Sequence, residues 1–204
     1  MCNADTVRDS YNQCHDQWAA YRKASRVNQC IVDFAALLHP GARCLDIGCG
    51  TGYPIDAYLV HEGFHVTGID VSERMIESAK ALLLPRASFS VQDILRYSPA
   101  ETFDAVIAFD SLWHIAWDRQ PELYGKIASL LRPGGYLFFT HGKQSGTVIG
   151  EMFGAKFYYS ALDVSEVHRL LAENGFSIVS STEDYREETT GHRELLIVAR
   201  KVSG

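Results

Sequence analysis

The amino-acid sequence predicts a single α/β domain, a three-layer sandwich in which helices cover both faces of a seven-stranded, mostly parallel sheet. Apolar, strand-like segments alternate with helical segments through most of the chain, which is the pattern of a parallel sheet with crossover helices. The last two apolar segments have no helix between them, so we expect them to pair antiparallel and to make the C-terminal strand antiparallel. With 204 residues, of which 47% are hydrophobic and 22% charged, the chain suits one domain with a sizeable core.

The expected elements follow from the apolar runs and from the residues that start or stop them. His39-Pro40-Gly41 ends the second of two helices expected within residues 5–38, because proline cannot continue a helix. Ser72 is placed to cap the helix that Pro85 closes. Further helices are expected over residues 54–62, 121–131 and 164–173. Strands are expected over residues 43–47, 64–69, 88–91, 103–109, 136–140, 176–182 and 194–200.

No helix or strand is predicted for two segments of the chain. Residues 142–160 are rich in glycine and aromatic residues, and no strand or helix pattern is evident there. The polar run over residues 183–193, which contains Glu187, Glu188 and Arg193, is expected to be a solvated loop between the two antiparallel strands.

Charge and cysteine content exclude several classes of protein. The 25 acidic residues outnumber the 19 basic ones, a formal net charge of −6, whereas proteins that bind nucleic acid broadly need a basic face. Five cysteines with no CxxC pair argue against a disulfide framework or a zinc site and favour a reducing cytosol. The polar N-terminus does not resemble a secretory signal, and no apolar run approaches the roughly 18 residues of a membrane span. We expect a cytoplasmic protein with small-molecule partners.

The strongest functional signal lies in the segment Leu45-Asp46-Ile47-Gly48-Cys49-Gly50-Thr51-Gly52. A strand that ends in a glycine-rich turn lets a ligand approach the backbone, because glycine has no Cβ in the way. The helix that follows directs its free N–H groups and positive dipole end at the turn, which favours a carboxylate or a phosphate. Asp70 ends the next strand, where its carboxylate can accept hydrogen bonds from both hydroxyls of a ribose. Together these features predict a nucleoside-containing ligand beyond the carboxyl ends of the strands.

The identity of the nucleoside ligand depends on which motifs are present. The dinucleotide fingerprint G-x-G-x-x-G needs a glycine where Tyr53 stands, and no Gly-Lys-Ser/Thr of a Walker motif is present. The residues instead resemble the class I S-adenosylmethionine-dependent methyltransferase family, small-molecule type, which implies a Rossmann-like fold. The matching motifs are LDIGCGTG (45–52), GIDVS (68–72), QDI (92–94), FDAVIAFDSLWHI (103–115) and LLRPGGYLFFT (130–140). The resemblance covers residues 40–141, and both flanks follow it only in the order of their elements.

The resemblance implies that S-adenosylmethionine is the cofactor and S-adenosylhomocysteine the product. Asp46, Gly48, Gly50 and Gly52 would surround the methionine moiety, whose carboxylate would face the helix N-terminus. Asp70 would bind the ribose hydroxyls.

The resemblance also implies an adenine site further along the same sheet edge. Val71 and Met75 would pack on the adenine, Asp93 would accept from its exocyclic amine, and Ile94 would supply a backbone donor. Phe109, at the end of the fourth strand, would lie at the methionine end. Plain core packing is the alternative for the three apolar side chains, and a helix or turn cap is the alternative for the two aspartates.

Candidate residues for the acceptor side follow the fourth and fifth strands. His114 and His141 both emerge at the edge where the cofactor would bind, and either could be the general base if the acceptor must lose a proton. A packing histidine is the alternative for each. Residues 154–160 (GAKFYYS) lie where this family often builds its acceptor pocket, although their aromatic side chains could equally bury an edge of the sheet.

The N-terminal segment carries aromatic residues at helical spacing. Tyr11, Trp18 and Tyr21 could form a lid or simply pack, and Arg22 could reach the cofactor carboxylate. On this basis the single domain divides into an N-terminal helical lid segment over 1–40, a cofactor-binding core over 41–141, and an acceptor-side segment with the last two strands over 142–204.

Two motif comparisons narrow the acceptor. Asp110 matches the first position of the Mg²⁺ site of catechol-type relatives, but Thr140-His141-Gly142 does not supply the Asp-Asn pair, so we expect no metal. Phe109-Asp110-Ser111-Leu112 stands in place of the Asn/Asp-Pro-Pro-Tyr motif of base-amine methyltransferases, which disfavours DNA and RNA acceptors.

Three functions stay open at this point. The leading hypothesis is methyl transfer from S-adenosylmethionine to a small molecule. The alternatives are an NAD-dependent oxidoreductase on a similar sheet and a non-catalytic protein that binds S-adenosylmethionine. The atom that is methylated, whether oxygen, nitrogen or sulfur, and the oligomeric state are left open.

Overall fold

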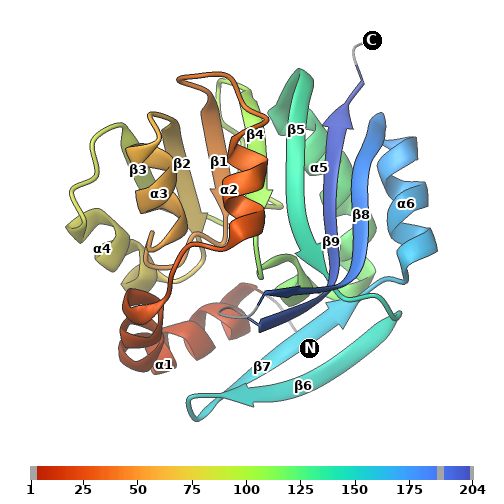
Figure 1. Cartoon of the computed structure of the whole chain (residues 1–204). Coiled ribbons are helices and arrows are strands. Elements are labelled where there is room, and N and C mark those ends of the chain that lie inside the picture. Colours follow the sequence, from red (N-terminus) through yellow and green to blue (C-terminus); the bar gives the residue numbers. More distant parts are fainter. Residues whose placement is uncertain (1–3, 188–190, 203–204) are drawn as a thin grey trace.

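A seven-stranded sheet with helices on both faces forms the body of the molecule (Figure 1). It is seen in a computed structural model that describes residues 4–187 and 191–202. In order across the sheet, the strands are β3 (Ala87–Val91), β2 (His65–Asp70), β1 (Arg43–Ile47), β4 (Phe103–Ala108), β5 (Leu131–His141), β9 (Gly191–Lys201) and β8 (Phe176–Glu187).

The direction of the strands confirms the predicted fold class. β1 pairs in parallel with β2 and β4, and β3 and β5 extend this parallel sheet on either side. β9 is antiparallel to both β5 and β8, as expected for two strands with no helix between them. The fold is therefore a Rossmann-like sandwich with an antiparallel C-terminal strand.

Helices cover the two faces of the sheet according to the alternation of its side chains. Cys44 and Leu45 of β1 point to opposite faces, because successive residues of a strand alternate. Cys44 packs in the layer of α2 and α3, and Leu45 in the layer of α5 and α6. The predicted cap of α4 is present, since the Ser72 hydroxyl accepts a hydrogen bond from the Met75 N–H at 3.1 Å. The helices are α1 (Ala4–Ala24), α2 (Gln29–Ala35), α3 (Ile55–His61), α4 (Glu73–Ala81), α5 (Gln120–Leu130) and α6 (Val164–Glu173).

Two segments differ from the prediction. Residues 142–160 contain most of an antiparallel hairpin, β6 (Gly146–Met152) and β7 (Ala155–Ala161), which lies apart from the main sheet. The described parts of the polar run, residues 183–187 and 191–193, are paired strand and not loop, because β8 and β9 continue into them and pair Tyr185 with Arg193. Sequence patterns miss both hairpins because much of their surface is exposed and their anchoring contacts come from distant residues. Glu188 lies outside the described residues.

Helix α1 is a single helix of 21 residues that runs between α4 and the β6–β7 hairpin. On the hairpin side, the Ser10 hydroxyl donates to the Lys156 carbonyl at 2.6 Å. On the α4 side, Arg74 forms an ion pair with Asp16 at 2.8 Å. Of the two N-terminal helices, only α1 reaches the cavity described below, because α2 is packed on the sheet through the ring of Phe34.

Two further observations concern the chain as a whole. None of the described helices has the length and apolar character needed to span a bilayer. The thiols of Cys14, Cys30, Cys44 and Cys49 are free, and Cys2 lies outside the described residues.

Candidate active site

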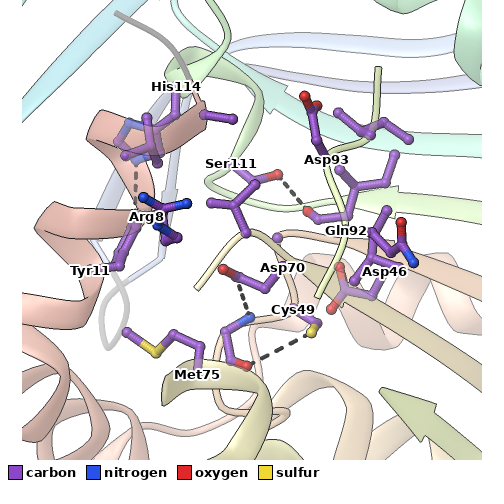
Figure 2. Close-up of a pocket in the computed structure, with 18 of the residues that line it drawn as sticks. Arg8, Tyr11, Asp46, Cys49, Asp70, Met75, Gln92, Asp93, Ser111 and His114 are labelled. Carbon is purple, nitrogen blue, oxygen red and sulfur yellow. Dashed lines mark hydrogen bonds between the residues drawn. The ribbon is translucent and has the colours of Figure 1, made fainter. Parts of the chain in front are cut away.

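A cavity of about 530 Å³ opens at the carboxyl ends of β1, β2 and β4 (Figure 2). Its walls come from α1, the glycine-rich turn after β1, the end of β2, the turn after β3 and the segment after β4. This is the topological switch point of the sheet, because β2 and β4 flank β1 on opposite sides. Open α/β sheets bind ligands at this position, and the volume is that of a small-molecule site.

The glycine-rich turn brings bare backbone to the cavity. Gly48 and Gly50 have φ angles of +77° and +55°, in the left-handed region that disfavours other residues. A Cβ at Gly48 would lie 2.5 Å from the Cβ of Ser111, whose hydroxyl donates to the Ile47 carbonyl at 2.6 Å. Glycine at this position therefore allows the segment after β4 to close against the turn.

Asp70 ends β2 and holds the glycine turn in place. Its Oδ2 accepts from the Gly50 N–H at 3.0 Å (Figure 2). Its Oδ1 accepts from the Ser72 N–H at 2.8 Å. Burial raises the pKa of this carboxyl to about 6, although the backbone donors lower it. Asp70 is thus a turn anchor, the alternative that the sequence raised, and a lining residue at the same time.

Asp46 and Arg22 place opposite charges in the same part of the cavity. Burial raises the pKa of Asp46 to about 7, and the Arg22 guanidinium acts against this rise. Burial lowers the pKa of Arg22, which lies 5.7 Å from the ring centre of Trp18 and donates to the Tyr53 carbonyl at 3.3 Å. The structure therefore places the carboxyl group of Asp46 and the guanidinium of Arg22 together beside the glycine turn.

The residues predicted for the adenine all belong to the lining of the cavity. Val71, Met75, Asp93 and Ile94 all line the cavity. Asp93 accepts a hydrogen bond from the Leu95 N–H at 3.0 Å, so this carboxylate caps its own turn and faces the cavity at once. The cap and the ligand contact are compatible at this residue.

Phe109 lines the cavity at the end of β4, and a residue of the C-terminal hairpin holds the segment that follows it. The Arg193 guanidinium donates two hydrogen bonds to the Asp110 carboxylate, at 3.0 and 2.6 Å. The same guanidinium stacks 4.8 Å from the ring centre of Phe109. Asp110 has a φ of +57°, which costs free energy in a residue with a side chain, so the ion pair stabilises a strained turn.

His114 and Tyr11 meet at the opposite end of the cavity from the glycine turn. The Nδ1 of His114 lies 3.0 Å from the Tyr158 carbonyl, which can only accept, so Nδ1 carries the proton. Nε2 is then an acceptor, and the Tyr11 hydroxyl donates to it at 2.9 Å (Figure 2). Burial lowers the pKa of His114 to about 4 and raises that of Tyr11 well above its ordinary value.

Two predicted site residues and one predicted segment do not line the cavity. Gly52 packs against α4, where a Cβ would lie 3.2 Å from Leu82 and from Phe89. His141 is buried, because β5 continues through it and turns its ring to the Gln120 side-chain oxygen at 3.0 Å. The aromatic residues of segment 154–160 do not line the cavity; Phe157 and Tyr159 pack against α1, and the ring centre of Phe157 lies 4.7 Å from that of Tyr11.

Comparison with known proteins finds similarity to methyltransferases. Residues 44–135 match a family model described as a methyltransferase domain. A probable thiol methyltransferase of Arabidopsis thaliana is 33% identical over 69% of this chain and 61% of its own length. A ubiquinone biosynthesis O-methyltransferase of Dechloromonas aromatica is 28% identical over 79% of this chain and 74% of its own length. These findings support a class I S-adenosylmethionine-dependent methyltransferase and do not favour the oxidoreductase alternative.

Solved structures of methyltransferases share the fold of this chain. A 1,6-didemethyltoxoflavin N1-methyltransferase of Burkholderia thailandensis with bound S-adenosylhomocysteine has a TM-score of 0.75 and 23% identity, over 98% of this chain and 89% of that one. A magnesium protoporphyrin IX methyltransferase of Synechocystis with bound S-adenosylmethionine has the same TM-score and identity, over 97% and 96%. Some curated relatives are much longer, and the chain spans only 37% of a sterol methyltransferase-like protein of Botryococcus braunii.

Sequence reasoning missed three residues of the site. Asp56 reads as an ordinary acid in the first turn of a helix, yet it is fully buried behind Asp46. The sequence around Arg193 indicates a polar loop. Its pairing with Asp110 could not be predicted, because the two residues lie far apart in the chain. Ser111 reads as a turn residue, and its close approach to Gly48 is visible only in three dimensions.

Proposed function

We propose that this protein transfers the methyl group of S-adenosylmethionine to a small-molecule acceptor that carries an acidic O–H or S–H group. The observation that carries the proposal is the carboxylate of Asp70, which faces the cavity at the end of β2 and is fixed to the glycine turn. The similarity of the chain to methyltransferases supports it.

The charged residues beside the turn fit the cofactor's two polar ends. Each Asp70 oxygen accepts one backbone N–H and keeps a lone pair for a ribose hydroxyl. Arg22 would hold the carboxylate of the methionine moiety, and Asp46 its ammonium group. The bare backbone of Gly48 and Gly50 leaves room for this moiety.

The apolar wall fits the remaining parts of the cofactor. Val71 and Met75 would pack on the adenine, Asp93 would accept from its amine and Ile94 would donate from its backbone. Phe109 would lie at the methionine end. When bound, S-adenosylmethionine supplies an electrophilic methyl group on a positively charged sulfur. The chain contributes mainly by holding the acceptor in line with that group.

The Tyr11–His114 pair would take the proton of the acceptor. Tyr11 already donates to Nε2 of His114, so a proton from the acceptor can pass to Tyr11 Oη as Tyr11's own proton passes to Nε2. The hydrogen bond from Nδ1 to the Tyr158 carbonyl keeps the ring in the tautomer that can accept. We propose His114 as the base and leave His141, which is enclosed by the core, without a catalytic role.

The pKa of His114 limits the class of acceptor. At about 4 the imidazole is neutral and able to accept at neutral pH, but it is a weak base. It therefore suits phenols and thiols, whose pKa values are about 10 and 8.5, better than aliphatic alcohols. The curated relatives include proteins named as an O-methyltransferase and a thiol methyltransferase. The net charge of −6 favours a small molecule over a nucleic acid.

A turnover assay tests this proposal. The protein is incubated with methyl-labelled S-adenosylmethionine and a panel of phenols, thiols, amines and aliphatic alcohols, and S-adenosylhomocysteine is quantified. We expect turnover with one or more phenols or thiols. Tight cofactor binding with no turnover on any acceptor would instead identify a non-catalytic binding protein, and turnover on amines alone would contradict the role of the Tyr11–His114 pair.

A further inference from the structure

Trp18 of α1 brings a hydrogen-bond donor close to the glycine turn. A Cβ at Gly50 would lie 3.5 Å from the indole Nε1 of Trp18, and both residues line the cavity. The indole N–H can only donate, and such a group finds an acceptor when it is taken out of water. Within residues 4–187 and 191–202, no side chain or carbonyl accepts from it. The donor is therefore available to a ligand in the cavity.

Aromatic neighbours hold the indole ring of Trp18 in this orientation. Its ring centre lies 5.9 Å from that of Tyr11 and 6.5 Å from that of Phe153, which follows β6. Both contacts are edge-to-face, with interplanar angles of 67°, an arrangement that aromatic pairs prefer. The packing of α1 within the protein therefore sets the position of the N–H.

A cation on the next turn of α1 lies beside this donor. Arg22 follows Trp18 by four residues, on the same face of the helix, and its guanidinium carbon is 5.7 Å from the ring centre of Trp18. The Tyr53 carbonyl accepts from Nε of Arg22 at 3.3 Å, which leaves the two terminal nitrogens for another acceptor. Asp46 and Asp110 attract the charge, but in the described parts of the chain neither forms an ion pair with it.

The two side chains together suit a carboxylate. Its two oxygens offer about four lone pairs, so it can accept from an indole N–H and from a guanidinium at once, and both hydrogen bonds gain from its charge. We propose that Trp18 and Arg22 form a carboxylate-binding pair on α1, in which the Trp18 N–H binds the amino acid carboxylate of S-adenosylmethionine beside Gly50. The identity of the carboxylate rests on the proposed function. Trp18 would then make the site select ligands that carry this group.

Two ligands that differ only in the carboxylate test the pair in the wild-type protein. Decarboxylated S-adenosylmethionine keeps the adenosine, the sulfonium and the amine. In calorimetry we expect S-adenosylmethionine to bind at least tenfold more tightly, since a hydrogen bond to a charged group is worth this factor. Equal affinities would overturn the inference and leave the cofactor assignment intact. Binding of neither ligand would defeat both.

Trp18→Phe separates the N–H from the packing of the ring. Phenylalanine keeps an aromatic ring for α1 and has no donor. We expect this variant to bind S-adenosylmethionine about tenfold more weakly than the wild type and decarboxylated S-adenosylmethionine within about twofold of it. Trp117→Phe is the matched control, because Trp117 does not line the cavity and donates to the Ser145 hydroxyl at 3.3 Å. Equal losses for the two ligands in Trp18→Phe, or no loss, would overturn the proposal.

The indole N–H signals in ¹H–¹⁵N spectra give a readout that does not depend on turnover. The chain has three tryptophans, and Trp18→Phe identifies the signal of Trp18. At saturation we expect this signal to move downfield with S-adenosylmethionine and not with the decarboxylated ligand, because only a carboxylate accepts its hydrogen bond. The Trp117 signal should stay in place with both. An equal downfield shift of the Trp18 signal with the two ligands, or none with either, would contradict the hydrogen bond.

Discussion

The guanidinium of Arg193 holds the carboxylate of Asp110 through two hydrogen bonds, although 83 positions separate the two residues in the chain. Arg193 belongs to β9, and Asp110 follows β4 at the wall of the cavity. The pair ties the C-terminal hairpin to the candidate active site. It also holds Asp110 in a left-handed conformation. The chain neighbours of Asp110, Phe109 and Ser111, both line the cavity.

Arg193→Gln should loosen this wall of the cavity. Loss of the charged hydrogen bonds is expected to lower the free energy of unfolding by about 1.5–3 kcal/mol, because the partly buried Asp110 carboxylate loses its charged partner and keeps only the Thr140 hydroxyl as a side-chain donor. We also expect weaker binding of S-adenosylhomocysteine. Arg186→Gln, an exposed change in the same hairpin, should alter stability by less than about 0.5 kcal/mol. Urea unfolding measures the stability of both variants. Equal free energies of unfolding would show that the ion pair of Arg193 with Asp110 does not stabilise the fold.

Asp70→Ala should weaken cofactor binding by more than the loss of a ribose contact alone. The substitution removes the acceptors of the ribose and also leaves the N–H groups of Gly50 and Ser72 without their partner. A loss of about 1.5 kcal/mol already weakens affinity roughly tenfold, and we expect at least this in calorimetry. Asp70→Asn, which keeps one acceptor oxygen, should lose less. Wild-type affinity in Asp70→Ala would refute the ribose assignment.

Gly48→Ala and Gly41→Ala separate backbone strain from close approach. The two glycines have φ angles of +77° and +74°, but only a Cβ at Gly48 meets a neighbour, Ser111, whereas Gly41 faces open space. Gly41→Ala should cost about 1–2 kcal/mol of stability and leave cofactor affinity unchanged. Gly48→Ala should cost more and impair binding, and Ser111→Gly should restore part of the loss. Similar effects of the two single changes in unfolding and binding assays would contradict the close approach.

His114→Gln should lower turnover by roughly 10²–10⁴-fold with little change in cofactor affinity, the usual contribution of a positioned base. Tyr11→Phe, which removes the hydroxyl between the acceptor and the imidazole, should lower turnover as well. His61→Gln, an exposed histidine on α3, is the control. Because His114 is already neutral, its titration should not reduce turnover between about pH 8 and 5.5. Full activity of the His114 variant would leave positioning alone as the source of catalysis.

The buried imidazole of His114 should also make folding stability sensitive to acid. Burial lowers its pKa from 6.5 to about 4, so below pH 6.5 the unfolded chain binds the proton more readily than the folded one. Stability from this group is present above pH 6.5 and is lost as the pH falls toward 4. Between pH 7 and 5 the wild type should lose about 2 kcal/mol more than His114→Gln in urea unfolding. His61→Gln should behave like the wild type. Equal losses in all three would show that His114 is not buried in its neutral form.

Local sequence signals predicted most of the fold and many of the residues that line the cavity. The turn after β1, the cap at Ser72 and the acid that ends β2 are each set by residues near one another in the chain. The same is true of the order of strands and helices, which follows from apolar runs and stop signals. The parallel sheet then brings the carboxyl ends of β1, β2 and β4 together without further information.

Features that depend on distant residues could not be predicted in this way. His141 looked available because it follows a strand, but β5 continues through it, and Gln120 encloses its ring. The polar hairpin looked like a loop because its anchor, the contact of Arg193 with Asp110, lies in another part of the chain. Asp56 gave no signal, since an acid in the first turn of a helix is ordinary until its burial is known.

Calorimetric titration of the wild-type protein with S-adenosylmethionine and S-adenosylhomocysteine tests the central claim most directly. The claim is that the cavity between α1 and the glycine turn is a cofactor site centred on Asp70. We expect saturable binding of both ligands at one site per chain, weakened at least tenfold in Asp70→Ala. The absence of measurable binding of either ligand, in a protein shown to be folded, would contradict the account.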